Sequence, residues 1–203
     1  ILKSPDLQLE EVGNPMKFKW NKCKLETVSF GHGITTTPLQ AVTVYSSLAN
    51  GGNMIQPSLI KNTKKNKNKK LISEKTSLKI VNILRKVVTD KAGTASLADI
   101  DGYYVGGKTG TSQNYENKNE NLNTFISIFP SQKPRYAMLV MLENPKIAEE
   151  LIYDYRGLKI KGTRNEAGWN SVYVAGKIIE KIGPILAIKS KDFNYNYVAE
   201  NIN

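Results

Sequence analysis

Two apolar runs joined by a very short link constrain the fold of this 203-residue chain more than any other feature. Residues 124–129 and 135–143 have the composition of β-strands, and the segment between them is Pro130-Ser131-Gln132-Lys133-Pro134. Such a link is too short for the crossover that parallel strands need, so it predicts an antiparallel pair. The fold therefore contains an antiparallel sheet.

A third strand is predicted over residues 103–111, and a helix with clear end signals precedes it. Thr37 suits the N-cap of that helix, Pro38 suits its first position, and Gln40 completes a capping box. Asn50-Gly51-Gly52 ends the helix, because glycine readily adopts the left-handed conformation of a helix C-terminus. The boundaries of this helix are therefore fixed at both ends.

Two further helices are predicted from apolar residues at helical spacing. The first covers residues 74–91 with Ser73 as its cap, and the second covers residues 169–182 with Gly183-Pro184 as its stop. The residues expected on the buried faces of the three helices are Ala41, Val44, Tyr45 and Leu48, then Ile80, Ile83, Leu84, Val87 and Val88, then Val172, Ala175, Ile179 and Ile182. Residues 1–29 are expected to be irregular, and residues 144–168 form a long polar connection. The predicted fold class is α/β of the α+β type, an antiparallel sheet flanked by helices.

The net charge of +11 raises the question of a polyanionic partner. Much of that charge lies at residues 61–70, where lysine alternates with asparagine and no aromatic residue could stack on a base. We interpret this stretch as a solvated loop and expect no nucleic-acid partner. A basic nucleic-acid binder remains an alternative that a salt-dependent shift with DNA would reveal.

Few residues are available for disulfide, metal or thiol chemistry. A single cysteine, Cys23, excludes an internal disulfide, and a single histidine, His32, leaves too few ligands for zinc. We expect a structural thiol at Cys23, a turn or packing role for His32, and core packing for Trp20 and Trp169. The longest apolar runs are far shorter than the roughly 20 residues of a membrane-spanning helix.

The most informative segment is Lys108-Thr109-Gly110-Thr111, within the third predicted strand. A lysine on a strand offers a positive charge beside a backbone edge, and an extended peptide could add to such an edge as another strand. Gly106, Gly107 and Gly110 are expected to keep side chains away from that peptide. The Lys108 ammonium and the Thr109 hydroxyl would suit a terminal carboxylate.

Several further blocks accompany this segment in a fixed order. They are Phe30-Gly31-His32-Gly33-Ile34, Thr37-Pro38-Leu39-Gln40, Leu48-Ala49-Asn50-Gly51-Gly52, Val87-Val88-Thr89 with Gly93-Thr94, Phe129-Pro130, Pro134-Arg135-Tyr136 and Ala167-Gly168-Trp169. Over residues 29–185 the chain thereby resembles the class B penicillin-binding proteins, the family of the cell-division peptidoglycan transpeptidase.

The resemblance implies the C-terminal part of the penicillin-binding, β-lactamase-like serine transferase fold over residues 1–188, with a tail at residues 189–203. It implies a parent enzyme that cross-links stem peptides ending in D-Ala-D-Ala by serine acyl transfer and takes β-lactams as inhibitors. Lys108, Thr109 and Gly110 would then be catalytic, and Lys108, Thr109 and Thr111 would bind substrate. No metal or organic cofactor is implied.

The family's nucleophilic Ser-x-x-Lys and its Ser-x-Asn element are expected to be absent from this chain. Ser58-Leu59-Ile60-Lys61 and Ser112-Gln113-Asn114 fit those patterns, but at the wrong places in the family order, so we interpret both as chance matches. The chain alone is therefore expected to be inactive.

The resemblance also implies a cellular location, and alternative functions for the chain remain open. It places the domain in the periplasm, anchored to the inner membrane upstream of this chain, with division or other cell-wall synthesis proteins as partners of the parent. A β-lactamase-like relative, or a non-catalytic remnant or peptide-binding module, remains open.

Overall fold

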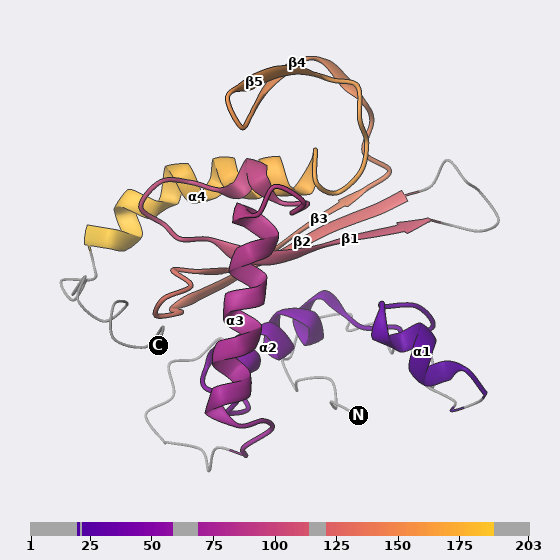
Figure 1. Ribbon diagram of the computed structural model, residues 1–203, viewed down its shortest axis with the longest axis vertical. Coiled ribbons are helices and arrows are strands. Elements are labelled where there is room, and N and C mark those ends of the chain that lie inside the picture. Colours follow the sequence, from indigo (N-terminus) through magenta and orange to yellow (C-terminus); the bar gives the residue numbers. More distant parts are fainter. Residues whose placement is uncertain (1–19, 21, 59–68, 114–120, 189–203) are drawn as a thin grey trace.

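The computed structural model describes residues 20, 22–58, 69–113 and 121–188 of the chain. Helices lie on both sides of an antiparallel sheet, and a small hairpin arches over one of those helices (Figure 1). The elements in chain order are α1 (Lys24–Ser29), α2 (Pro38–Ala49), α3 (Glu74–Thr89), η1 (Ser96–Ala98), β1 (Gly106–Gln113), β2 (Asn121–Phe129), β3 (Tyr136–Glu143), β4 (Ala148–Tyr155), β5 (Leu158–Gly162) and α4 (Ser171–Ile188).

The main sheet has three strands in the order β1-β2-β3, and both pairs are antiparallel. Thr109 of β1 lies opposite Phe125 of β2, which lies opposite Val140 of β3. The three predicted strands and the antiparallel hairpin at residues 130–134 are confirmed. The strand that carries Lys108 is at the edge of this sheet.

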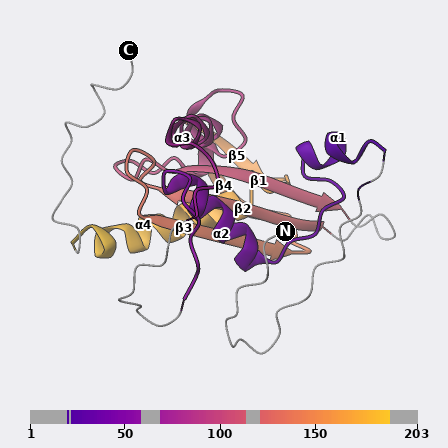
Figure 2. The same cartoon turned by 90° about the horizontal axis from the view of Figure 1, so that it is seen from below.

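Each face of the sheet has its own apolar core, because successive side chains of a strand point to opposite faces. On one face, Phe125, Phe129 and Val140 form a cluster with residues of α4, namely Val172, Ala175 and Ile179. On the other face, Ile128 packs with Val81 and Leu84 of α3, beside α2. Figure 2, which views α3 nearly end-on, shows this helix on the β1 side of the sheet. The predicted α/β class with helices flanking an antiparallel sheet is confirmed.

The predicted helix ends of α2 are present as hydrogen bonds. The Gln40 backbone N–H donates to Thr37 Oγ1 at 3.1 Å, and the Thr37 N–H donates to Gln40 Oε1 at 2.9 Å. The helix ends at Ala49, and Gly51 and Gly52 follow with left-handed φ angles of 61° and 79°. The Ser73 cap of α3 is also confirmed, since its Oγ accepts from the Thr76 N–H at 3.1 Å.

The buried faces of α2 and α3 differ from the prediction. The buried residues of α2 are polar, Gln40, Thr43 and Ser47, whereas the predicted apolar set is only half-buried. Ser47 can be buried because its hydroxyl donates to the Thr43 carbonyl and accepts from the Ile55 N–H. In α3, Leu84 and Val88 are buried as predicted, but Ile83 is 61% exposed.

The last helix does not stop where we predicted. It continues through Gly183 and Pro184 to Ile188, and Pro184 lies inside it. Gly183 is buried against Tyr103, where a Cβ would stand 2.2 Å from a ring carbon. The glycine therefore serves close packing of a continuous helix, and a local stop signal is overridden by a tertiary contact.

Parts of the secondary structure escaped prediction. Residues 144–168 contain the β4–β5 hairpin, and α1 occupies part of the segment expected to be irregular. Trp20, expected in the core, is 68% exposed. Residues 61–68 of the lysine-rich stretch and the predicted tail at residues 189–203 lie outside the described residues. Within the described part of the chain, no helix has the length and apolarity to cross a bilayer.

Candidate functional site

The Lys108-Thr109-Gly110-Thr111 segment lies in the middle of β1, at the sheet edge. Lys108 is exposed, Thr109 is half-buried and Thr111 is exposed. Their position follows from the register, which pairs Lys108 with Ile126 and Thr109 with Phe125. β1 pairs only with β2 among the strands that the structure describes, so its outer edge can receive an extended chain.

The glycines of β1 have a different role from the one we predicted. A Cβ at Gly106 would lie 3.1 Å from the Arg85 backbone nitrogen of α3, and one at Gly107 would lie 2.5 Å from the Ile126 carbonyl oxygen. At Gly110 a Cβ would lie 2.6 Å from the Thr124 hydroxyl. These glycines therefore admit neighbouring parts of the same chain, and the prediction that they clear a path for a peptide is not supported by the contacts.

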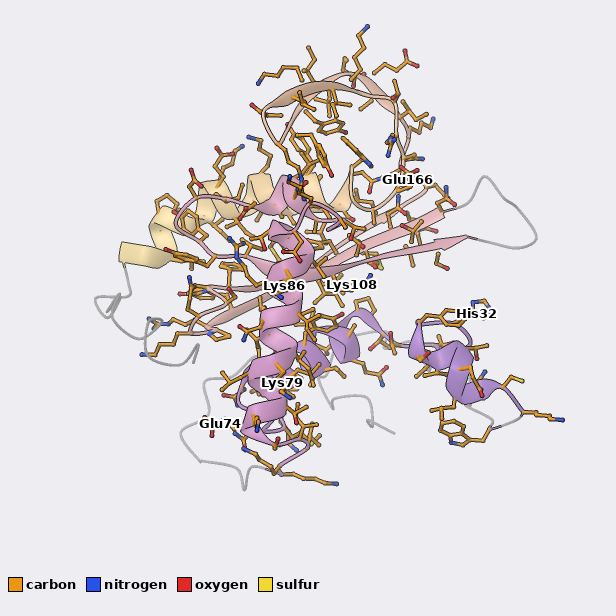
Figure 3. All side chains as sticks on the ribbon, in the orientation of Figure 1. His32, Glu74, Lys79, Lys86, Lys108 and Glu166 are labelled. Atoms are coloured by element: carbon orange, nitrogen blue, oxygen red, sulfur yellow. The ribbon has the colours of Figure 1, made fainter. Side chains whose placement is uncertain are left out.

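The Lys108 side chain bends back over its own strand. Lys108, which is labelled in Figure 3, donates from its Nζ to the Thr109 carbonyl oxygen at 2.8 Å, in a contact that is exposed to solvent. A ligand carboxylate could displace this carbonyl acceptor, because its negative charge adds a Coulombic attraction to the ammonium that a neutral carbonyl lacks. The ammonium is thus available to an anion at the edge of β1.

Lys108 and Thr109 lie on opposite faces of β1. Lys108 shares its face with Ile126, while Thr109 and Thr111 share theirs with Phe125. An anion that contacts both groups must therefore sit at the strand edge, where the two faces meet.

The two threonine hydroxyls are each held by another part of the chain. Thr109 Oγ1 is 2.9 Å from Thr94 Oγ1, in the turn that follows α3. Thr111 Oγ1 accepts from the Ala167 backbone N–H at 3.3 Å. The side chain of Thr111 is thus engaged in structure, which leaves its backbone as the group that could act on a ligand. Both Thr94 and Ala167 belong to sequence blocks that carry the family resemblance. Nothing in the sequence, however, predicts these two contacts.

The β4–β5 hairpin lies close to the same turn. The Tyr155 ring stacks on Trp169 at 4.9 Å, and Arg156 lies over Tyr155 at 5.5 Å. The Arg156 guanidinium also donates to the Asp90 carbonyl at the end of α3. The hairpin tip is therefore tied to the chain that leads to Thr94. Trp169, predicted in the core, is half-buried and packs on the hairpin instead.

Arg85 and Tyr153 are titratable side chains near the site whose environment the contacts define. Arg85 of α3 forms an ion pair with Asp99 at 2.8 Å and donates to the Val105 carbonyl at 2.7 Å, which fixes the start of β1. Burial raises the pKa of the Tyr153 hydroxyl in the hairpin, and the nearby Tyr173 and Glu150 raise it further. Tyr153 therefore stays neutral at physiological pH.

The other candidate residues are not assembled into a catalytic group. Ser58 is exposed in a loop after α2, and Ser112 sits near the end of β1 on the strand itself. Exposed His32 stacks near Phe30 with ring centroids 6.3 Å apart. Cys23 is exposed at the start of the short helix α1. The alternative partners Lys61 and Asn114 lie outside the described residues.

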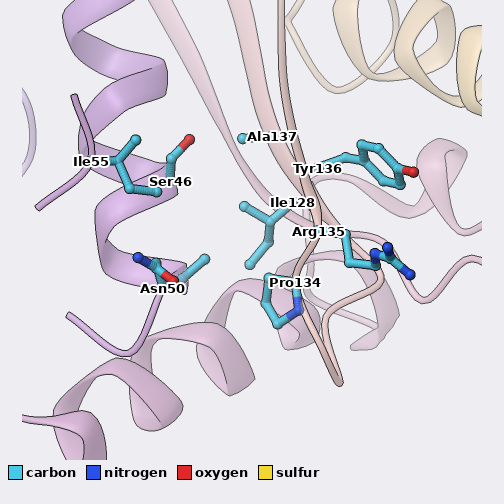
Figure 4. A pocket seen from close by; sticks show the side chains of 9 residues that line it. Ser46, Asn50, Ile55, Ile128, Pro134, Arg135, Tyr136 and Ala137 are labelled. Carbon is cyan, nitrogen blue, oxygen red and sulfur yellow. The ribbon is translucent and has the colours of Figure 1, made fainter. Parts of the chain in front are cut away.

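A cavity of about 190 Å³ lies elsewhere, between α2 and the β2–β3 hairpin (Figure 4). Its lining residues are Ser46, Ala49, Asn50, Ile55, Ile128, Pro134, Arg135, Tyr136 and Ala137. It contains none of the residues 108–111 and no pair of acid–base groups. The strand edge, not this cavity, is the candidate site.

Comparison with known proteins identifies the family to which the chain is similar. The family described as the penicillin binding protein transpeptidase domain matches residues 4–164. The chain is 31% identical over 206 residues to a probable peptidoglycan D,D-transpeptidase FtsI of Caulobacter vibrioides, covering 94% of this chain and 33% of that protein. It is 32% identical over 181 residues to the stage V sporulation protein D of Bacillus subtilis, covering 81% of this chain and 25% of that protein. The chain thus spans a quarter to a third of the length of these relatives.

Solved structures show the same fold. The transpeptidase domain of the FtsI4 D,D-transpeptidase from Legionella pneumophila superposes with a TM-score of 0.61 at 26% identity, covering 81% of this chain and 55% of that one. A peptidoglycan glycosyltransferase structure from Burkholderia ambifaria has a TM-score of 0.65 at 19% identity, over 88% of this chain and 52% of that one. The latter likeness concerns the fold alone.

Proposed function

This chain belongs to the penicillin-binding protein transpeptidase domain family, and we propose that it forms the carboxylate-binding side of a peptidoglycan D,D-transpeptidase site. The observation that carries the proposal is the exposed Lys108 on an edge strand, followed by Thr109, Gly110 and Thr111 and lying within the matched residues 4–164. The name of the Caulobacter vibrioides relative, a probable peptidoglycan D,D-transpeptidase, supports the reaction class.

In the proposed site the substrate is a stem peptide that ends in D-Ala-D-Ala. Its terminal carboxylate accepts hydrogen bonds from the Lys108 ammonium and the Thr109 hydroxyl at the edge of β1. The backbone N–H of Thr111 donates to the oxyanion that forms when the carbonyl is attacked, an interaction whose loss typically costs about 2.7–4 kcal/mol. The Thr111 side chain is held by Ala167, which keeps this backbone in place.

The nucleophile is a serine of the full-length protein that lies outside this chain. Its hydroxyl oxygen forms a bond to the carbonyl carbon of the penultimate D-Ala, and its proton passes to the amine of the departing terminal D-Ala. An amine of a neighbouring stem peptide then displaces the serine and takes over the acyl group. β-Lactams enter the same site, where their amide bond opens and the acyl group stays on the serine.

The cellular setting follows from the same proposal. Cross-linking of stem peptides takes place on the outer side of the inner membrane, so we propose a periplasmic domain that a segment outside this chain anchors. Division or other cell-wall synthesis proteins would contact the full-length protein.

Labelling with a fluorescent penicillin tests the proposal, because it compares the full-length protein, which contains the nucleophile, with this chain, which does not. The full-length protein that contains this chain should give a covalent fluorescent band in a denaturing gel, whereas the 203-residue chain alone should give none. The reason is that the nucleophile lies outside the chain. No band from the full-length protein would contradict the transpeptidase assignment, and a band from the chain alone that is lost in Ser58→Ala would overturn the placement of the nucleophile.

A further inference from the structure

The Thr109 hydroxyl has a partner that lies 15 residues earlier in the sequence. Thr94 Oγ1 and Thr109 Oγ1 are 2.9 Å apart, and either hydroxyl could be the donor. This is the one hydrogen bond that the described part of the chain gives to either side chain. Thr94 lies in the turn between α3 and η1, so the contact joins that turn to the candidate site on β1.

The backbone of Thr94 is held on both sides. The N–H of the next residue, Ala95, which is fully buried, donates to the Val87 carbonyl of α3 at 3.1 Å. Gly168, just before α4, lies so close that a Cβ there would be 2.5 Å from the Thr94 carbonyl oxygen. The Thr94 hydroxyl is therefore presented to Thr109 from a fixed backbone.

The same loop before α4 also holds β1. Ala167 is fully buried and its N–H donates to Thr111 Oγ1, while its carbonyl accepts from the buried Ser171 hydroxyl at 3.1 Å. Thr94 and Thr111 are thus both braced by the pair Ala167–Gly168. The backbones of Thr94 and of β1 are therefore held in place relative to each other, which lets the hydroxyls of Thr94 and Thr109 meet at 2.9 Å.

We propose that Thr94 is a positioning residue that orients the proton of Thr109 toward the substrate carboxylate. The inference rests on the proposed function, in which Thr109 binds that carboxylate. A hydroxyl has one proton and two lone pairs, and a carboxylate only accepts. Thr109 can therefore serve the carboxylate only as a donor, and the Thr94 hydroxyl then donates to Thr109 Oγ1.

The resulting chain of hydrogen bonds runs from Thr94 to Thr109 to the carboxylate. Donation by Thr94 polarises the Thr109 hydroxyl and strengthens its bond to the anion. Without Thr94 the Thr109 hydroxyl can rotate freely, so that its proton is no longer held in place for the carboxylate before the ligand arrives. Thr94 acts in this scheme through Thr109 and need not touch the substrate.

Second-order rates of penicillin acylation in the full-length protein test this inference. Thr94→Val keeps the shape of the side chain and removes its hydroxyl, so the rate should fall roughly three- to tenfold, the effect of one neutral hydrogen bond. Thr94→Ser keeps the hydroxyl and should restore most of the rate. Thr89→Val is the matched control, because the exposed Thr89 hydroxyl only donates to the Arg85 carbonyl of its own helix.

A double variant shows whether Thr94 acts through Thr109. The variant with both Thr94→Val and Thr109→Val should react no more slowly than Thr109→Val alone, because the second hydroxyl has nothing left to orient. Losses that multiply would overturn the inference, as would an unchanged rate in Thr94→Val. A rate loss that follows a fall in melting temperature would also overturn it, since it would indicate a structural role.

Failure of the proposed function gives a different result. In that case the wild-type full-length protein itself is not acylated, and the inference fails with it. If the wild-type protein reacts and Thr94→Val reacts equally fast, only the inference fails.

Discussion

Lys108→Ala in the full-length protein should slow acylation by penicillin about 10- to 150-fold. Hydrogen bonds that involve a charged group contribute about 1.5–3 kcal/mol, and each 1.4 kcal/mol corresponds to a factor of ten. The Lys108 side chain is exposed and, within the described residues, bonds only its own strand, so the free energy of unfolding should change by no more than about 0.5 kcal/mol. The second-order acylation rate and the melting temperature of the same variant separate binding from folding.

Two further variants sharpen this test. Lys108→Arg should recover only part of the rate, because a planar guanidinium differs from a compact ammonium in reach and geometry. Lys86→Ala removes another exposed lysine, from the last turn of α3, and should leave the rate unchanged. If Lys86→Ala is as slow as Lys108→Ala, general positive charge explains the effect and the specific role of Lys108 is wrong.

Phe125→Ala should lower the free energy of unfolding by about 3–5 kcal/mol, the usual cost of removing a fully buried phenylalanine. The Phe125 side chain is fully buried in the core between the sheet and α4, beside Val140. Its ring also fills the space that Gly107 leaves, where a Cβ would lie 2.6 Å from a ring carbon. Urea denaturation of the variant and of the wild-type protein measures the difference.

A matched control for this core variant is available on the hairpin. Leu158 of β5 is 64% exposed, so Leu158→Ala removes apolar atoms without opening a cavity and should change stability by less than about 0.5 kcal/mol. Equal losses in Phe125→Ala and Leu158→Ala would contradict the packing described here.

The structural features that depend only on neighbouring residues could be predicted from the sequence. The capping box at Thr37 and Gln40 involves residues three apart, and the hairpin at residues 130–134 depends on the length of its link. Each of these features is dictated by the chemistry of a few neighbouring residues.

The failures arose where distant residues decide the structure. The β4–β5 hairpin is anchored by Tyr155 on Trp169, a contact between separate segments that no periodicity within 144–168 reveals. Gly183-Pro184 is a local signal for a helix stop. The residue that packs against Gly183, Tyr103, is 80 positions away, so the local sequence does not show that the helix continues. A glycine in the sequence does not show which part of the chain packs against it. For the same reason the sequence does not predict that the glycines of β1 make room for α3 and β2.

The candidate site could likewise be predicted in part from the sequence. The motif at residues 108–111 stands out in the sequence, and the strand period alone puts Lys108 and Thr109 on opposite faces. The contact between Thr94 and Thr109 could not be predicted, because it depends on how the turn after α3 meets β1.

The central claim, that Lys108 recognises a carboxylate, is tested most directly by changing the ligand. Acylation rates of the full-length protein are compared for a penicillin with its free carboxylate and for the methyl ester of the same penicillin, in wild type and in Lys108→Ala. We expect the wild-type protein to prefer the free acid and Lys108→Ala to lose most of this preference, because the ester offers the ammonium no charge. A preference for the free acid that is equally large in Lys108→Ala would contradict it.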